Sequence, residues 1–253
     1  MGKLIKYELK KQRTTRMVIL VGLAAGLIAY TAGILFDLEN VMLISLGLIA
    51  IMAWPVLFYV GIESIFIFNQ DLRTKQSYML WMVPKSIWEI LGAKFISAIL
   101  QILIVFVMYA AAAAVAGFVT IVRFSDFQTV LESFGELTVV FGESGISLTD
   151  MIWFLVYVFL LWTIAVMIGF LAVILSRTVL LRSRFAGFFA AVLFVLINMA
   201  VGWLYSMMMY ILSGVVDMSA SPLWNMLDVV FYLLASAALF GISGWIAQRK
   251  LSV

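Results

Sequence analysis

The residues able to do chemistry in this chain are a few carboxylates and amides set among apolar side chains. Histidine and cysteine are both absent from the sequence, so it has no imidazole base, no thiol nucleophile and no disulfide. No G-x-x-x-x-G-K-[ST] stretch occurs, so the chain lacks a phosphate-binding loop of that kind. Serines and acids are present without a recognisable catalytic spacing. We therefore expect no enzyme active site in this chain.

Glu63 is the acid of greatest interest, because it lies toward the inner end of a long apolar stretch. A carboxylate at such depth must pair, bind a proton or face water. Its candidate cationic partners are Arg177, Lys94 and Arg184. Glu63 is either a gate or coupling element, or an interfacial acid that reaches headgroup water. Pro55, in the same stretch, predicts a kink, which would be either a gating hinge or a fixed shape.

Other polar and aromatic side chains inside the apolar stretches have simpler interpretations. Gln101, Asn198 and Asn225 predict helix–helix hydrogen bonds more readily than substrate contacts. Asp228, near the outer end of the last stretch, predicts an interfacial acid. Three deeper tryptophans are candidates for lining a cavity, although packing explains them as well: Trp54, Trp162 and Trp203.

Membrane-spanning helices must position these residues. Apolar residues make up 66% of the sequence and charged residues 11%, which leaves too little polar surface to cover a soluble globule. One span needs roughly 20 apolar residues. The predicted fold class is therefore all-α, a polytopic membrane protein with a single transmembrane domain over residues 1–253. Its six expected spans are 17–36, 41–68, 95–122, 151–176, 185–213 and 223–247.

Lysine and arginine mark one face of this arrangement. Of the 16 basic residues, all but Arg123 fall before the first span, after the sixth, or in the links that follow the second and fourth spans. The positive-inside rule places that face and both termini in the cytoplasm, with the chain in the plasma membrane. Positive charge along membrane borders favours anionic lipid as a partner and not nucleic acid.

Three segments outside the spans carry patterns of their own. Residues 1–16 predict an interfacial helix, with apolar and basic side chains on opposite arcs. The link 37–40 is short enough to predict an antiparallel hairpin of the first two spans. The outer loop, 123–150, contains a capping-box sequence and apolar residues at helical spacing, which predict a short amphipathic helix.

Residues 70–94 form the most informative cytoplasmic segment. An apolar run, 78–83, is stopped by a proline. Ser86 and Glu89 then have the spacing of a capping box, so a new helix is expected near Ile87. The run is too apolar for a solvated loop and needs either lipid or a protein groove. The pattern alone leaves both occupants open.

These features together resemble the type-2 permease family of ABC transporters. The resemblance rests on the basic amphipathic start Leu4-Ile5-Lys6-Tyr7-Glu8-Leu9, on Glu63 followed by Asp71, and on Met79-Leu80-Trp81-Met82-Val83-Pro84-Lys85-Ser86, which closes with Ile90-Leu91-Gly92-Ala93-Lys94. The six-span topology matches over the whole chain, whereas the local motif covers a short part of it. Lys85 departs from the family pattern, since members often carry a small residue there.

The resemblance implies that the chain is one half of a permease. Such halves pair, here as an expected homodimer, and bind two copies of a separate ABC ATPase subunit. ATP and Mg would be held by that ATPase, and no cofactor by this chain. A helix within residues 71–88 would serve as the coupling helix in a groove of the ATPase. The residues assigned to coupling are Asp71, Arg73, Lys75, Tyr78, Met79, Leu80, Trp81, Met82 and Lys85.

The function implied is the membrane subunit of an ATP-driven exporter. A short chain without a large outer domain is similar to bacterial exporters of antimicrobial or amphipathic peptides, so a peptide substrate is expected. Two alternatives remain. The chain could be a peptide-sensing or immunity scaffold that works with an ATPase. It could also be a secondary carrier driven by an ion gradient, which would call for several buried acids near the midplane.

Overall fold

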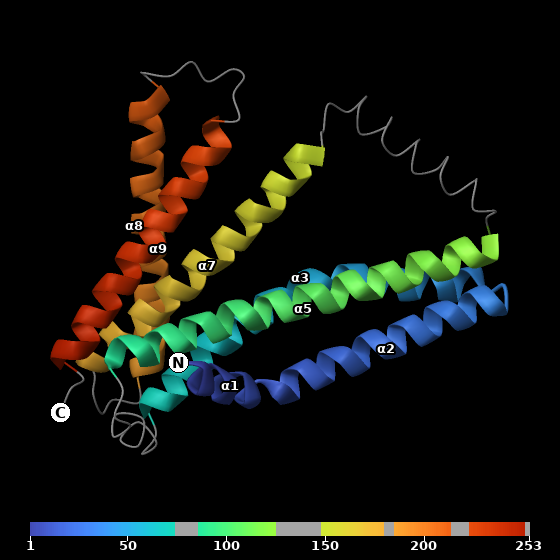
Figure 1. The fold of residues 1–253 in the computed structure, drawn as a ribbon, viewed down its shortest axis with the longest axis horizontal. Coiled ribbons are helices and arrows are strands. Elements are labelled where there is room, and N and C mark those ends of the chain that lie inside the picture. Colours follow the sequence, from blue (N-terminus) through green and yellow to red (C-terminus); the bar gives the residue numbers. More distant parts are fainter. Residues whose placement is uncertain (74–85, 125–147, 180–184, 214–222, 251–253) are drawn as a thin grey trace. The chain divides into compact units, whose positions relative to one another are not determined.

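The computed structural model describes residues 1–73, 86–124, 148–179, 185–213 and 223–250, and these residues are almost entirely helical (Figure 1). The helices follow one another as α1 (Gly2–Lys11), α2 (Arg13–Leu35), α3 (Glu39–Arg73), α5 (Ile87–Phe124), α7 (Leu148–Val179), α8 (Ala186–Ser213) and α9 (Leu223–Lys250).

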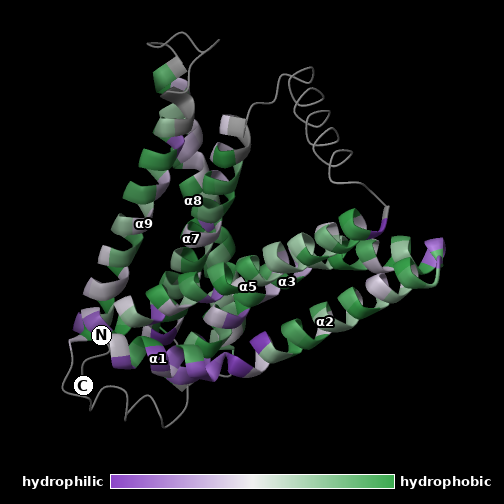
Figure 2. Ribbon diagram, turned by 45° about the vertical axis from the view of Figure 1, so that its right-hand side comes forward, coloured by the Kyte–Doolittle hydropathy of each residue, from purple (hydrophilic) through white to green (hydrophobic). Residues whose placement is uncertain are grey.

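Six of these helices, all except α1, are long and apolar enough to cross a membrane. Figure 2 shows apolar residues along their length and polar residues gathered on α1 and at helix ends. The chain is therefore an all-α, multi-pass membrane protein with six spans, as the sequence predicts.

Five of the six spanning helices run beyond the predicted spans, and the largest extensions are in α3 and α5. α3 continues to Arg73, and α5 begins at Ile87. The backbone N–H of Glu89 donates to Ser86 Oγ at 3.2 Å, so the predicted cap and helix start are both confirmed. The ends of the 70–94 segment are thus helical. Its centre, 74–85, and most of the outer loop with its predicted amphipathic helix lie outside the described residues.

Contacts group the chain into two compact units. Unit 1 comprises residues 1–5, 61–98 and 152–253, and unit 2 comprises residues 6–60 and 99–151. α3 and α5 each contribute one part to each unit. Each unit has a core of its own.

α7 is the central helix of unit 1. Two thirds of its most apolar stretch is buried (67%), against 28% or less for every other span. Ile164, Met167 and Ile168 of α7 pack with Tyr232 and Leu239 of α9. Glycines let neighbours approach α7 closely: a Cβ at Gly61 of α3 would lie 2.8 Å from the Trp162 ring.

Unit 2 is built on the hairpin of α2 and α3, which confirms the prediction. Asp37 turns the chain with φ 52, and the Leu38 amide donates to the Gly33 carbonyl at 2.8 Å. Only a glycine fits at position 33, since a Cβ there would lie 2.8 Å from the Met42 backbone nitrogen. Tyr30 binds Thr120 of α5 by a 2.5 Å hydroxyl contact, which fixes the hairpin to α5.

The predicted amphipathic helix at the start of the chain is present as α1. Lys3, Lys6 and Lys10 are exposed, as expected. The most buried residues, however, are the polar Glu8 and Gln12, at 7% and 3% exposure. The predicted arc was Met1, Leu4, Ile5 and Leu9, and of these Met1 is exposed and the others are half-buried. The prediction considered only lipid beneath the helix, whereas the side of α1 that carries Glu8 packs against protein.

Candidate functional site

Polar side chains from three helices meet inside unit 1 at the end where α3 and α7 finish and α5 begins. We call this the basic end, because Lys94, Arg177 and Arg249 lie there. The basic-end cluster consists of four residues: Asn69, Asp71, Lys94 and Arg177. Its members come from the last turns of α3 and α7 and the second turn of α5. It flanks the segment 74–86 on both sides.

An ion pair joins the two helices on either side of that segment. The Lys94 ammonium binds the Asp71 carboxylate, and their side chains are only 4% and 10% exposed. The Lys94 Nζ also lies 5.7 Å from the centre of the Phe68 ring. Asp71 sits in the last turn of α3, where the helix dipole disfavours a carboxylate. The positive charge of Lys94 offsets both the unfavourable helix dipole and the lost hydration of the Asp71 carboxylate.

A second polar contact joins α7 to α3. Arg177 donates twice to Asn69 Oδ1, from Nε at 3.1 Å and from Nη2 at 2.7 Å. Arg177 lies in the last turn of α7, where the helix dipole favours a cation. The adjacent Ser176 hydroxyl donates to the Ala186 carbonyl at the start of α8. The end of α7 is therefore bonded to helices on both sides.

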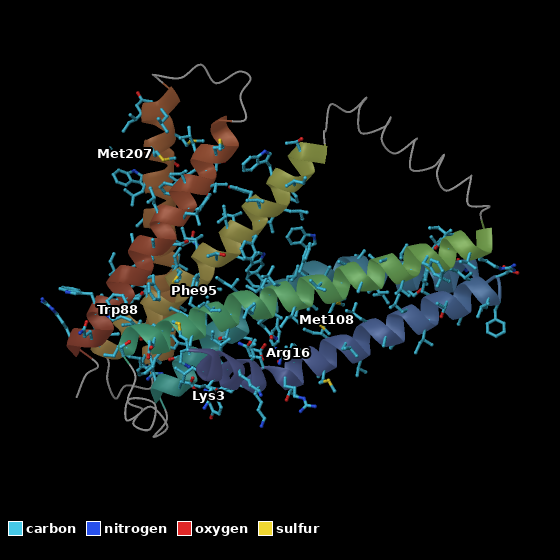
Figure 3. The ribbon with its side chains drawn as sticks, in the orientation of Figure 1. Lys3, Arg16, Trp88, Phe95, Met108 and Met207 are labelled. Atoms are coloured by element: carbon cyan, nitrogen blue, oxygen red, sulfur yellow. The ribbon has the colours of Figure 1, made fainter. Side chains whose placement is uncertain are left out.

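Aromatic packing fixes the start of α5 against α9. Trp88 covers Gly244, where a Cβ would overlap the indole ring. The rings of Trp88 and Phe240 lie 5.7 Å apart. Gly92, one turn later on α5, faces Met1 and Phe240, so the first residue of the chain and α9 both pack against the start of α5. Figure 3 shows Trp88 at the start of α5, with Phe95 farther along the helix.

These contacts connect the ends of three helices. Asp71 precedes the 74–86 segment and Lys94 follows it, so their ion pair holds the two flanking helix ends together. The Asn69–Arg177 contact extends the connection to α7, the helix with the largest share of unit 1's core. Contacts at the two flanks of the segment therefore link α3, α5 and α7. Among the described residues, no three Asp, Glu, His or Cys side chains gather as a metal site would require.

The predicted coupling residues fall into two groups. Asp71 is buried and pairs with Lys94, and its part in coupling stays a prediction. Arg73 is the last residue of α3. The others lie outside the described residues, so their docking role stays a prediction: Lys75, Tyr78, Met79, Leu80, Trp81, Met82 and Lys85.

The predicted gate residues lie in α3. Glu63 is half-buried in unit 1. Two of its candidate partners make contacts within the basic-end cluster, Lys94 with Asp71 and Arg177 with Asn69, while Arg184 lies outside the described residues. The pairing of Glu63 stays a prediction. α3 continues through Pro55, so this proline does not end the helix.

The three candidate cavity tryptophans differ in their surroundings. Trp162 is half-buried and packs against Gly61. Trp54 and Trp203 are 57% and 67% exposed on this single chain. Lining of a cavity by these residues stays a prediction.

The sequence missed two contributors to the polar interior. These are Asn69 and Arg16, and neither is singled out by the sequence pattern. Arg16 Nη1 donates to the fully buried Gln101 Oε1 at 2.9 Å, and Nη2 donates to the Leu9 carbonyl at 2.6 Å. The predicted helix–helix hydrogen bond of Gln101 is thereby confirmed. Figure 3 shows Arg16 where α1 meets α2.

No family model, curated protein or solved structure matches this chain. The assignment of function accordingly depends on the residues and on their geometry.

Proposed function

We propose that this chain is the permease subunit of an ATP-driven exporter of the ABC type. It sits in the plasma membrane with the basic end and both termini in the cytoplasm. It moves an amphipathic or hydrophobic substrate, of which peptide is the best match, out of the cell. The energy comes from a separate ATPase subunit that holds ATP and Mg.

The observation that carries this proposal is the ion pair of Asp71 and Lys94 across the ends of the 74–86 segment. Breaking a buried ion pair by removing one partner costs about 3–5 kcal/mol. The two flanking helices are therefore expected to move as one body. Anchoring on both sides suits a segment on which a protein outside the membrane exerts force.

Two features of the sequence support an external source of energy. The chain carries no phosphate-binding loop of the G-x-x-x-x-G-K-[ST] type. The apolar residues Tyr78 to Met82 lie between two polar borders, which suits the groove of a partner protein. We assign that groove to the ATPase, with two ATPase copies serving two permease chains.

The test uses the chain purified in mild detergent from cells that also express their own ATPase subunits. Trp81→Glu places a charge in the apolar run, and Trp81→Phe keeps an aromatic ring there as the matched control. We expect ATP hydrolysis to co-purify with the unaltered chain and with Trp81→Phe. Trp81→Glu is expected to co-purify with at least about tenfold less ATP hydrolysis, which is equivalent to a loss of 1.4 kcal/mol of binding.

Equal hydrolysis with Trp81→Glu and Trp81→Phe would contradict the docking assignment. Transport by the purified chain in vesicles without an ATPase would contradict the exporter itself and favour an ion-driven carrier. Hydrolysis without accumulation of any substrate would favour a sensing or immunity scaffold.

A further inference from the structure

A carboxylate surrounded by tyrosines lies in unit 1, far along α9 from the basic end. Asp228 Oδ1 accepts a hydrogen bond of 2.7 Å from the Tyr205 hydroxyl. Asp228 and Arg249 are separated by about 30 Å of helix, at 1.5 Å per residue. This acid is therefore remote from the basic-end cluster and takes no part in it.

Three tyrosines from three helices form this second site. The Tyr205 ring of α8 stacks on the Tyr232 ring of α9, with centroids 5.7 Å apart. Tyr157 of α7 approaches Tyr232 edge-on, also at 5.7 Å, and the two hydroxyls lie 3.5 Å apart. Tyr232 is buried, while Asp228, Tyr157 and Tyr205 are half-buried and remain within reach of a ligand.

The polar character of this face continues along α9. Asp228, Tyr232 and Ser236 follow at intervals of four residues, which places them on one side of the helix. Ser236 is 7% exposed, and its hydroxyl has no hydrogen-bond partner in the part of the chain that the structure describes. The site thus offers an unsatisfied polar group two turns inward from the carboxylate.

The two helices that carry Asp228 and Tyr205 offer no nearby cation. Residues 185–248, which include all of α8 and nearly all of α9, contain neither lysine nor arginine. The one basic residue of α7, Arg177, lies in its last turn at the basic end. Tyr205 is the only side chain bonded to Asp228 within the described residues. A phenol hydrogen bond leaves the negative charge in place. Asp228 is half-buried at the end of the last span, where a cationic partner offsets its lost hydration.

We propose that Asp228, with Tyr157, Tyr205 and Tyr232, binds an organic cation, such as an ammonium or guanidinium group. The free Asp228 oxygen supplies the counter-charge, the phenol oxygens accept hydrogen bonds, and the ring π-systems attract the cation. One carboxylate among apolar rings suits a weakly hydrated organic cation better than a small metal ion, which takes many oxygen ligands. The site does not depend on the exporter function. In an exporter it would hold the positive end of an amphipathic substrate.

The test measures equilibrium binding of radiolabelled tetraphenylphosphonium to the purified chain in uncharged detergent. We expect saturable binding that benzyltrimethylammonium displaces. Asp228→Asn is expected to lose at least about tenfold in affinity, since it removes the negative charge that attracts the cation. Asp228→Glu keeps the charge and should bind within a few fold of the unaltered chain. Asp37→Asn, at an exposed acid of unit 2, is the matched control and should bind normally.

Tyr205→Phe distinguishes the hydroxyl from the ring. It should weaken binding less than Tyr205→Ala does, because it keeps the aromatic face. Absence of saturable binding by the unaltered chain would overturn the proposal, as would undiminished binding by a folded Asp228→Asn variant. Displacement of the probe by Na⁺ but not by K⁺ at constant ionic strength would assign the site to an inorganic cation instead. A normal melting temperature of Asp228→Asn shows that lost binding is not lost folding.

Discussion

The buried pair of Asp71 and Lys94 is the residue-level feature on which the account depends. Either charge without the other would destabilise the folded chain, because each is removed from water. The exposed pair of Arg123 and Asp37, at 3.5 Å with side chains 50% and 71% exposed, gives a natural comparison. Solvent screens the second pair, so its contribution is small.

Lys94→Met should destabilise the chain by about 3–5 kcal/mol, because it removes the cation of a buried ion pair. Asp37→Asn, which breaks the exposed pair, should cost about 1 kcal/mol or less. Unfolding of both variants by sodium dodecyl sulfate titration from mild detergent measures the difference. Equal losses would show that burial at the basic end does not strengthen the pair.

The double variant Asp71→Asn/Lys94→Met separates folding from coupling. Replacing both members of a buried pair with uncharged groups is often close to neutral for stability. We expect this variant to fold and to co-purify with ATPase activity while losing any stimulation of hydrolysis by substrate, since the link between the helix ends is gone. Retained stimulation, measured in the purified complex, would mean that the ion pair has a purely structural role.

At the scale of elements, close helix contacts depend on glycines that meet bulky side chains. Gly244 of α9 lies under the Trp88 ring, whereas no described heavy atom lies within 4 Å of a Cβ built at Gly241 on the same helix. These two glycines, one turn apart, therefore allow a matched comparison.

Gly244→Ala should destabilise the packing of α5 on α9 by about 1–3 kcal/mol, because the added methyl overlaps a rigid indole. Gly241→Ala should be neutral or stabilise by less than about 1 kcal/mol, since alanine favours a helix. Melting temperatures in one detergent measure both effects. Partial recovery of the melting temperature in Gly244→Ala/Trp88→Ala would confirm that the indole is the obstacle. A melting temperature of Gly244→Ala equal to that of the unaltered chain would exclude this contact.

The helices were predictable because their signals are local. Apolar length gave the six spans, the spacing of Ser86 and Glu89 gave the start of α5, and a short link gave the hairpin. The partners of Lys94, Arg177 and Arg16 were not predictable, since each joins residues far apart in the sequence. Asn69 lies 108 positions from Arg177, and no helical periodicity connects them.

At the scale of the whole molecule, the distribution of charge predicts orientation. The absence of cysteine makes this directly measurable with single-cysteine variants. Lys3 and Gln248, near the two termini, and Asp37, in the turn between α2 and α3, are all exposed.

Lys3→Cys and Gln248→Cys should react with a membrane-impermeant maleimide only after cells are permeabilised, whereas Asp37→Cys should react in intact cells. The expected contrast follows from the six spans, which put both termini on one side and the first hairpin turn on the other. Labelling of Lys3→Cys in intact cells would reverse the orientation and place the 74–86 segment outside.

The most direct test of the central claim is photo-cross-linking from position 81. A benzophenone amino acid replaces Trp81 in native membranes, and the cross-linked product is probed with azido-ATP. The account predicts a product between this chain and an ATP-binding subunit, which is lost when the neighbouring Met82 is changed to Glu. Cross-links to lipid alone, or reaction of position 81 with impermeant reagents added outside intact cells, would contradict it.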